Sequence, residues 1–284
     1  MNVLRSVAIL TLVILPMLSA CTTGIADFQL YEQAYQAQAV EADRVLDRLA
    51  SAERVVARRS DPSLSGAFEF DPDKAAYYVD AGDPPLTGAI RSGLNAVTTY
   101  NAMLAGLANG ESAAALTSRA GTLYSNLLAT AEALSVVAGV STAFVPGAQA
   151  LASRLLPLAE QIQKLRNRAA FRRKLLQAYP DMRALLVRLR DGTREMYTVI
   201  QRSYVKRGVI RNRGIPAADM PKLESDRKLL AGWVILMDQT LVSMDAATRV
   251  VLAGASASDA TVLMDASVDL RVQAERVRDA TRSQ

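Results

Sequence analysis

Apolar and small side chains recur at three- and four-residue steps near the start of the chain. The series consists of Phe28, Tyr31, Tyr35, Ala39, Ala42, Leu46, Leu49, Ala52 and Val56. A mean step near 3.5 residues places these side chains on one face of an α-helix. The stripe therefore predicts a helix of about nine turns, which at 1.5 Å per residue is ~50 Å long.

Helix-breaking residues divide the following sequence into further segments. The first helix is expected to stop at Ser60-Asp61-Pro62, and repeated Asp, Gly and Pro residues predict a loop up to Pro85. A second helix is expected over 86–107, ending at Asn109-Gly110, where glycine can adopt the left-handed cap conformation. A third helix is expected over about 112–138.

The second half of the chain contains four more expected helices. The first of them reaches Tyr179, with Pro157 near its start or at a kink, and the next runs over 180–209. The last two run from Pro221 through Val251 and from an Asp259 cap to a frayed tail at 281–284. The uncharged stretch 133–153 is interpreted as a buried hairpin of small residues, and turns are expected at 211–216 and 254–258. No alternating strand pattern competes with these segments. The expected fold is all-α, an elongated bundle of about seven long helices.

The first twenty residues have the pattern of an export signal. Arg5 supplies one positive charge, an uncharged apolar run extends from Val7 to Leu18, and small residues close the segment. Such a run fits the core of a signal peptide and is shorter than the ~20 apolar residues that span a bilayer. We therefore expect a cleaved signal peptide at residues 1–20.

Leu18-Ser19-Ala20-Cys21 resembles the lipobox of bacterial lipoprotein precursors, where a leucine and two small residues precede the modified cysteine. The resemblance covers about the first 23 residues only. It implies that Cys21 becomes the first residue of the mature chain and carries a diacylglyceryl group, with a further acyl chain such as palmitate on the new amino terminus. A thiolate is a good nucleophile for this chemistry, and two or three acyl chains anchor a protein durably.

Thr22 follows the lipobox, in place of the aspartate that holds some bacterial lipoproteins at the inner membrane. This resembles sorting to the outer membrane, with the protein facing the periplasm. We expect a lipidated tether at 21–27 and a helical-bundle domain at 28–284. The alternatives are an ordinary signal peptide followed by an unmodified cysteine, or an uncleaved anchor.

The net charge of +5 is distributed unevenly. Residues 154–213 contain sixteen basic and four acidic side chains. The candidate contacts for an anionic surface are Arg166, Arg168, Arg172, Arg173, Lys174, Arg183, Arg188 and Arg190. They can attract anionic lipid headgroups or an acidic protein, or they can be the solvated faces of helices that face the acidic first third of the chain.

The stretch 67–85 combines four aspartates with four aromatic residues, Phe68, Phe70, Tyr77 and Tyr78. One interpretation is a connector whose aspartates cap helices, and another is an aromatic loop that docks a partner. A Ca²⁺ site is disfavoured because the glycine and the terminal glutamate of the EF-hand spacing are missing. We expect no metal and no cofactor.

Catalysis is disfavoured by the residue types that the chain contains. It has no histidine, and its single cysteine is the expected lipidation site. Ser225 and Lys228 match the S-x-x-K pattern, but the S-D-N and K-T-G elements of the serine enzymes that use it are absent. Trp233, Met237 and Met244 share the apolar stripe of the sixth helix and are expected in the core.

The sequence thus predicts a non-enzymatic, membrane-anchored lipoprotein with a structural or protein-interaction role in the cell envelope. Its expected partners are the membrane, through the lipid, and an envelope protein. Nucleic acid is not expected because the product is exported and no binding motif is recognised. The alternative function is a carrier of a lipid or other hydrophobic ligand, or an accessory of envelope transport, with an apolar cavity between small-residue helices.

Overall fold

The computed structural model describes residues 3–64, 70–137, 144–205, 214–253 and 256–282, with side chains from Ala26 onward. Within these ranges the chain is all-α and contains no strand, which confirms the expected fold class. Eight helices have twelve residues or more, against the seven expected: α1 (Val3–Ser60), α3 (Pro85–Ala108), α4 (Ala113–Val136), α5 (Phe144–Gln163), α6 (Arg168–Asp191), α7 (Thr193–Tyr204), α8 (Met220–Ala253) and α9 (Ala257–Arg282). Short helical turns connect them: η1 (Pro62–Leu64), η2 (Pro72–Lys74), α2 (Ala75–Tyr78) and η4 (Ala217–Asp219).

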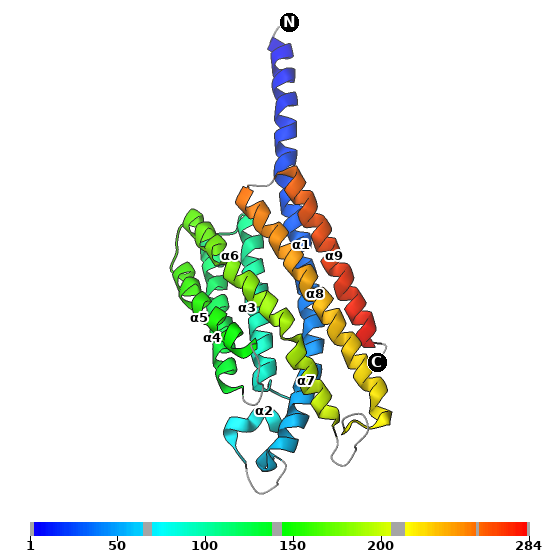
Figure 1. Ribbon diagram of the computed structural model, residues 1–284. Coiled ribbons are helices and arrows are strands. Elements are labelled where there is room, and N and C mark those ends of the chain that lie inside the picture. The colour runs from blue at the N-terminus through cyan, green and yellow to red at the C-terminus, as the bar shows by residue number, and fades with distance from the viewer. Residues whose placement is uncertain (1–2, 65–69, 138–143, 206–213, 254–255, 283–284) are drawn as a thin grey trace.

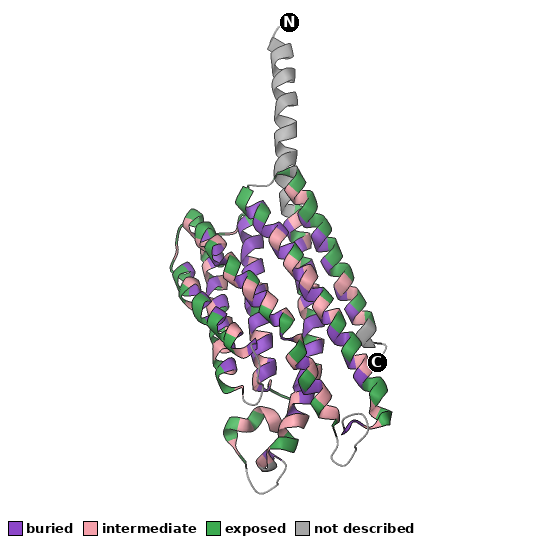
Figure 2. Ribbon diagram, in the orientation of Figure 1, coloured by how far each residue is buried: buried purple, intermediate pink, exposed green. Residues whose placement is uncertain are grey.

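The helices form an elongated bundle around α1 (Figure 1). Helices α3, α7, α8 and α9 pack against α1, and α4 and α5 lie beyond α3. Helix α6 contacts α3, α5 and α8 and so joins the two parts of the bundle. Figure 2 shows that buried residues follow the inward faces of these helices. Trp233, Met237 and Met244 are fully buried, so their predicted place in the core is confirmed.

Helix α1 is fixed to its neighbours by polar contacts inside the bundle. The Tyr31 hydroxyl donates to Asn101 Oδ1 of α3 at 2.6 Å. The guanidinium of Arg48 donates to both carboxylate oxygens of Asp226 in α8 at 2.8 and 2.6 Å. The Tyr204 hydroxyl of α7 donates to the same carboxylate at 2.8 Å. Arg48 also donates to the Tyr204 hydroxyl at 3.0 Å, so directional bonds set the axial position of α1 against α3, α7 and α8.

Helix α3 obtains its N-terminal cap from another helix. Pro84, at the cap position, provides no side-chain hydrogen bond. The backbone N–H groups of Leu86 and Thr87 instead donate to the carboxylate of Glu53 in α1, each at 3.0 Å. A carboxylate suits this position because it accepts from free N–H groups at the positive end of the helix dipole.

The glycine conformation predicted for the α3–α4 turn is confirmed, and a serine cap follows it. Gly110 has a φ of 79°, the left-handed conformation expected from the Asn109-Gly110 pair. The Ser112 hydroxyl accepts from the Ala115 backbone N–H and caps α4. The cap predicted at Asp259 is wrong, because Ser256 Oγ accepts from the Asp259 backbone N–H and Ser256 occupies the capping position.

The helix start predicted at Pro180 is wrong, and so is a helix start near Pro157, although a position inside a helix was the alternative for Pro157. Pro157 lies inside α5 and Pro180 lies inside α6. Both are on exposed helix faces, where water can bond the carbonyls that proline leaves without a donor. The real breaks fall at 164–167, where Asn167 Oδ1 accepts from the N–H groups of Ala169 and Ala170, and at Gly192. The predicted small-residue hairpin falls partly at 138–143, outside the described residues, and α5 begins within its second half.

The predicted tether after Cys21 is helical, since α1 runs without interruption from Val3 to Ser60. Figure 1 shows the first part of α1 extending beyond the bundle at the end marked N. Phe28 is the first buried side chain among those described. The expected turns at 211–216 and 254–258 fall partly outside the described residues.

Loss of the Asp226 carboxylate is expected to destabilise the fold by about 3 kcal/mol. Asp226 is only 3% exposed, and Asp226→Ala leaves the guanidinium of Arg48 half-buried without its anionic partner. Urea unfolding measures the change. The control is Arg227→Ala, whose exposed pair with Glu224 should contribute less than about 0.5 kcal/mol. Equal stability of the two variants would contradict the assignment.

Candidate functional site

The basic residues predicted as surface contacts fall into groups with different roles. Arg168 donates to the Leu107 carbonyl at the end of α3, and Arg172 donates to the Val251 carbonyl at 2.9 Å and the Leu252 carbonyl at 2.8 Å at the end of α8. These two guanidinium groups donate to carbonyls in the last turns of α3 and α8, where intrahelical N–H donors run out. They therefore serve the fold.

A second group pairs with acidic residues of α8. Arg183 Nε lies 3.1 Å from Asp245 Oδ1, and Arg190 Nε lies 2.9 Å from Asp238 Oδ1. Internal pairing was one of the two interpretations of the basic segment. These carboxylates belong to the last third of the chain, so the expectation that these arginines face the acidic first third is wrong.

The four remaining candidates make no bond to a helix end and no ion pair within the described residues. Arg166, Arg173 and Arg188 are exposed and make no hydrogen bond or ion pair with any residue in the described ranges. Lys174 is half-buried and donates to Gln177 at 3.0 Å. Three of the eight predicted arginine and lysine contacts thus have neither a hydrogen bond nor an ion pair within the described residues.

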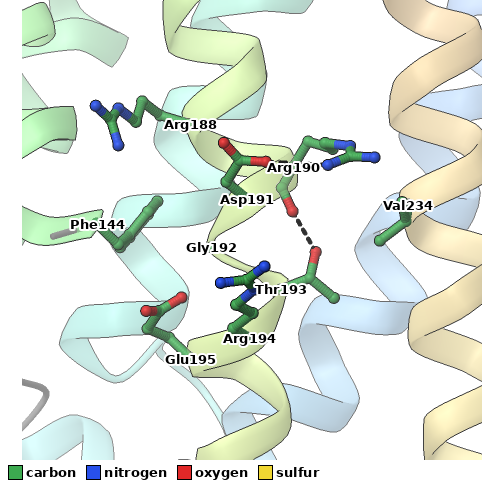
Figure 3. Close-up of a pocket in the computed structure, with 9 residues that line it drawn as sticks. All are labelled: Phe144, Arg188, Arg190, Asp191, Gly192, Thr193, Arg194, Glu195 and Val234. Carbon is green, nitrogen blue, oxygen red and sulfur yellow. Dashed lines mark hydrogen bonds and ion pairs between the residues drawn. The ribbon is translucent and has the colours of Figure 1, made fainter. Parts of the chain in front are cut away.

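A pocket of about 350 Å³ opens where α6 ends and α7 begins (Figure 3). It is lined by Phe144, Arg188, Arg190, Asp191, Gly192, Thr193, Arg194, Glu195 and Val234. Arg188 and Arg194 provide guanidinium groups without a partner among the described residues. Asp191 and Glu195 bring negative charge to the same walls, so the pocket is suited to polar side chains of both signs and not to an apolar ligand.

Gly192 shapes this pocket by its lack of a side chain. A Cβ built on Gly192 would lie 2.7 Å from the Phe144 ring. Phe144 is 4% exposed and packs directly over the α6–α7 break. The φ of Gly192 is −61°, a value that any residue can adopt. Glycine is therefore required here by close packing against Phe144 and not by the backbone conformation. Sequence analysis missed this position because Gly192 and Phe144 are distant along the chain.

Two tyrosines lie in contact with an arginine and an aspartate, the kind of cluster in which an enzyme tunes a proton donor. Tyr204 contacts Arg48 and Asp226, and Tyr179 contacts Arg183 and Asp245. Burial, reinforced by the hydrogen bond to Asp245, raises the pKa of Tyr179 to about 12. Burial and Asp226 also raise the pKa of Tyr204. Both phenols therefore stay protonated near neutral pH, as hydrogen-bond donors between helices.

The aromatic residues of the predicted partner loop are separated in the structure. Phe68 lies outside the described residues. Phe70 is 72% exposed, and its ring stacks on Tyr78 with centroids 5.2 Å apart. Tyr77 is half-buried, and burial raises its pKa to about 12. The Phe70–Tyr78 pair is the part of this loop available for contact.

The aspartates of the same loop bond to different partners. Asp71 caps η2 through the Asp73 backbone N–H, as the capping interpretation predicts. Asp80 pairs with Arg54 at 3.0 Å and Asp83 with Arg91 at 2.7 Å. Among the described residues, no group of three or more potential ligands is close enough to hold a metal ion.

Cys21 lies within α1, in the part of that helix whose side chains are not described. One described stretch, Ala217–Ala253, is long and apolar enough to cross a membrane by length and composition, and 56% of its most apolar window is buried inside the bundle. That burial is what a core helix of the bundle requires. Lys228, of the S-x-x-K match, is exposed on α8.

Fold and site together define the class of this protein as an all-α bundle whose polar clusters join helices. No protein-family model, curated protein or solved structure matches the chain. The functional argument therefore depends on the residues themselves.

Adding a side chain at Gly192 is expected to destabilise the protein by about 1–3 kcal/mol, because the new methyl group overlaps the Phe144 ring. Thermal unfolding of Gly192→Ala measures this. Gly82→Ala is the control, since its Cβ would meet no atom closer than 3.9 Å. In a Phe144→Leu background the penalty should shrink, and an unchanged penalty would show that Phe144 is not its cause.

The raised pKa of Tyr179 predicts a loss of stability at high pH. The folded protein holds this proton up to a pKa of about 12, whereas the unfolded chain releases it near 10, so stability falls as the pH rises between these values. Ionisation of tyrosine is followed by absorbance at 295 nm as the pH is raised. Subtracting the titration curve of Tyr179→Phe from that of the wild type gives the titration of the Tyr179 phenol. In Asp245→Asn the pKa should fall but stay above 10, because burial is the largest cause. A Tyr179 pKa near 10 in the wild type would contradict the structure.

Proposed function

We propose that this chain is the precursor of a bacterial lipoprotein, anchored by acyl chains on Cys21 and facing the periplasm from the outer membrane. The observation that carries the proposal is the spacing of the leader, the lipobox-like Leu18-Ser19-Ala20-Cys21 and the first buried side chain, Phe28. Cleavage before Cys21 removes no described buried residue. The bundle is therefore compatible with loss of the leader.

The role proposed for the bundle is structural or protein-binding, without catalysis. The outward faces of the adjacent helices α8 and α9 expose large apolar side chains: Ile235 (51%), Val242 (49%), Val262 (45%), Met264 (40%), Val268 (45%) and Val272 (39%). Exposed apolar groups gathered on neighbouring elements are typical of contact surfaces. The raised pKa values of Tyr179 and Tyr204 also favour a structural role, as hydrogen-bond donors between helices, over proton transfer.

The pockets bear on the alternative function of a lipid or hydrophobic-ligand carrier. A carrier needs an enclosed space with apolar walls. The pocket at the α6–α7 break is open and has charged walls. A second pocket, between α1 and α9, is lined in part by Glu41, Arg44, Arg271, Glu275 and Arg278. These two pockets favour an interaction role over transport of an apolar ligand.

Intact-mass spectrometry of the protein extracted from its native membrane tests the anchor. We expect the wild type to begin at Cys21 with added acyl mass, and Cys21→Ala to lack that mass and to leave the membrane fraction or remain unprocessed. Thr23→Ala, two residues away, is the control and should be lipidated normally. A wild-type product without acyl mass, starting elsewhere, would overturn the proposal.

A further inference from the structure

One end of the bundle lies next to the site of the proposed anchor. The Tyr31–Asn101 and Glu53–Leu86 contacts show that α1 and α3 are antiparallel, so α3 ends beside the start of the described part of α1. The Arg48–Asp226 bond and the 3.4 Å Tyr35–Thr240 bond give α8 the same direction as α3. Continuing that register places the end of α8 level with the start of the mature chain, in agreement with Figure 1.

The basic segment at the start of α6 belongs to this same end. Arg168 bonds to the end of α3, and Arg172 bonds to the end of α8. The turn 164–167 immediately precedes them. We call this region, made of 107–112, 164–174, 249–253 and 256–259, the anchor-side end.

The anchor-side end carries an excess of positive charge. Its basic side chains are Lys164, Arg166, Arg168, Arg172, Arg173, Lys174 and Arg249, and its acidic side chains are Glu111 and Asp259. Two carboxylates at or beside it are already paired, Glu111 with Arg119 at 2.8 Å and Glu160 with Lys164 at 2.6 Å. Asp27, at the start of the described part of α1, adds one further acidic group.

Like Arg249 of α8, Arg166 and Arg173 are free charges of this end. All three are exposed and have no hydrogen bond or ion pair within the described part of the chain. Arg173 lines a groove of about 610 Å³ together with Asn167, Ala169, Ala170, Arg172, Leu176 and Leu252. Leu252 is 58% exposed, so the groove offers both a cation and an apolar side chain to whatever covers it.

The length of the tether limits what can cover this end. The buried Phe28 lies seven positions after Cys21, a span of ~10 Å as a helix and at most ~25 Å fully extended. Electrostatic attraction to an anionic membrane acts over a Debye length of about 8 Å at physiological salt. A tether of this length allows the anchor-side end to reach the headgroup layer, where its arginines come within range of the headgroup charge.

We propose that the anchor-side end docks on anionic lipid headgroups of the membrane that holds the acyl chains, with Arg166 and Arg173 as its contacts. This rests on the proposed lipidation of Cys21. The acyl chains fix the protein to the membrane, and the two arginines fix its orientation. The opposite end of the bundle and the outward faces of α8 and α9 then remain accessible to a protein partner.

The single cysteine of the chain makes a direct test possible. Once Cys21 is lipidated, a cysteine introduced elsewhere is the only free thiol. The exposed Ala169 reports on the anchor-side end, and the exposed Ala218 of η4 reports on the opposite end. Each variant, Ala169→Cys or Ala218→Cys, is purified with its lipid, labelled with a fluorophore and reconstituted in vesicles that contain a headgroup-labelled quencher lipid.

We expect strong quenching at position 169 and little at 218 in vesicles of phosphatidylcholine with about 30% phosphatidylglycerol. Arg166→Gln with Arg173→Gln should lower the ratio of docked to undocked protein about 25-fold, since each cation near an anionic membrane is worth about fivefold. Arg58→Gln with Arg202→Gln removes the same charge at the opposite end and should change nothing. Unfolding temperatures should match in both pairs, because these side chains have no described internal bonds.

The outcomes separate this inference from the proposed function. Equal quenching at position 169 in pure phosphatidylcholine and in anionic vesicles would overturn the docking, and so would unchanged quenching in the Arg166→Gln, Arg173→Gln variant. In either case the acyl mass of the same sample would still support the anchor. Absence of acyl mass would overturn both. Protection of position 169 in native envelopes, but not in anionic vesicles, would identify an acidic protein as the occupant and would also overturn the inference.

Discussion

Burial of α1 is the constraint on which the rest of the structure depends. Its apolar stripe, from Phe28 to Ala52, must be covered, and α3, α7, α8 and α9 all pack against this one helix. Burial of large side chains such as Tyr31 and Leu46 supplies non-directional stabilisation. Apolar burial alone would permit the surrounding helices to slide along α1.

Polar contacts remove this freedom. Tyr31, Arg48 and Glu53 bond to α3, α7 and α8 at different heights along α1, and each bond is satisfied at only one axial position. Arginines perform a similar task on the other side of the bundle, where Arg168 and Arg172 complete the ends of α3 and α8. The arginine-rich composition is thus partly explained by helix ends and ion pairs inside one chain.

The chemistry of the anchor-side end is a consequence of these contacts. Fixing α6 through Arg168 and Arg172 brings Arg166 and Arg173 to the end where α1 leaves the bundle. The charge that is left over at that end is therefore a result of the packing and not of the segment's composition alone. An anchor and a basic surface on the same side would orient the molecule, and the apolar faces of α8 and α9 would remain available for a protein contact.

The sequence by itself determined the all-α class, the stripe of α1, the core position of Trp233 and the turn at Gly110, because each depends on spacing or on a local backbone preference. Pro180 misled because packing of the surrounding helix outweighs the local cost of about 3 kcal/mol that proline brings to a helix interior. Only the tertiary structure decided which arginines are free. Arg183 and Arg173 have the same chemistry in the same segment, yet Arg183 meets Asp245 and Arg173 meets no described partner. The closeness of Gly192 to Phe144 was likewise beyond reach, because a contact between distant segments leaves no periodic trace in the chain.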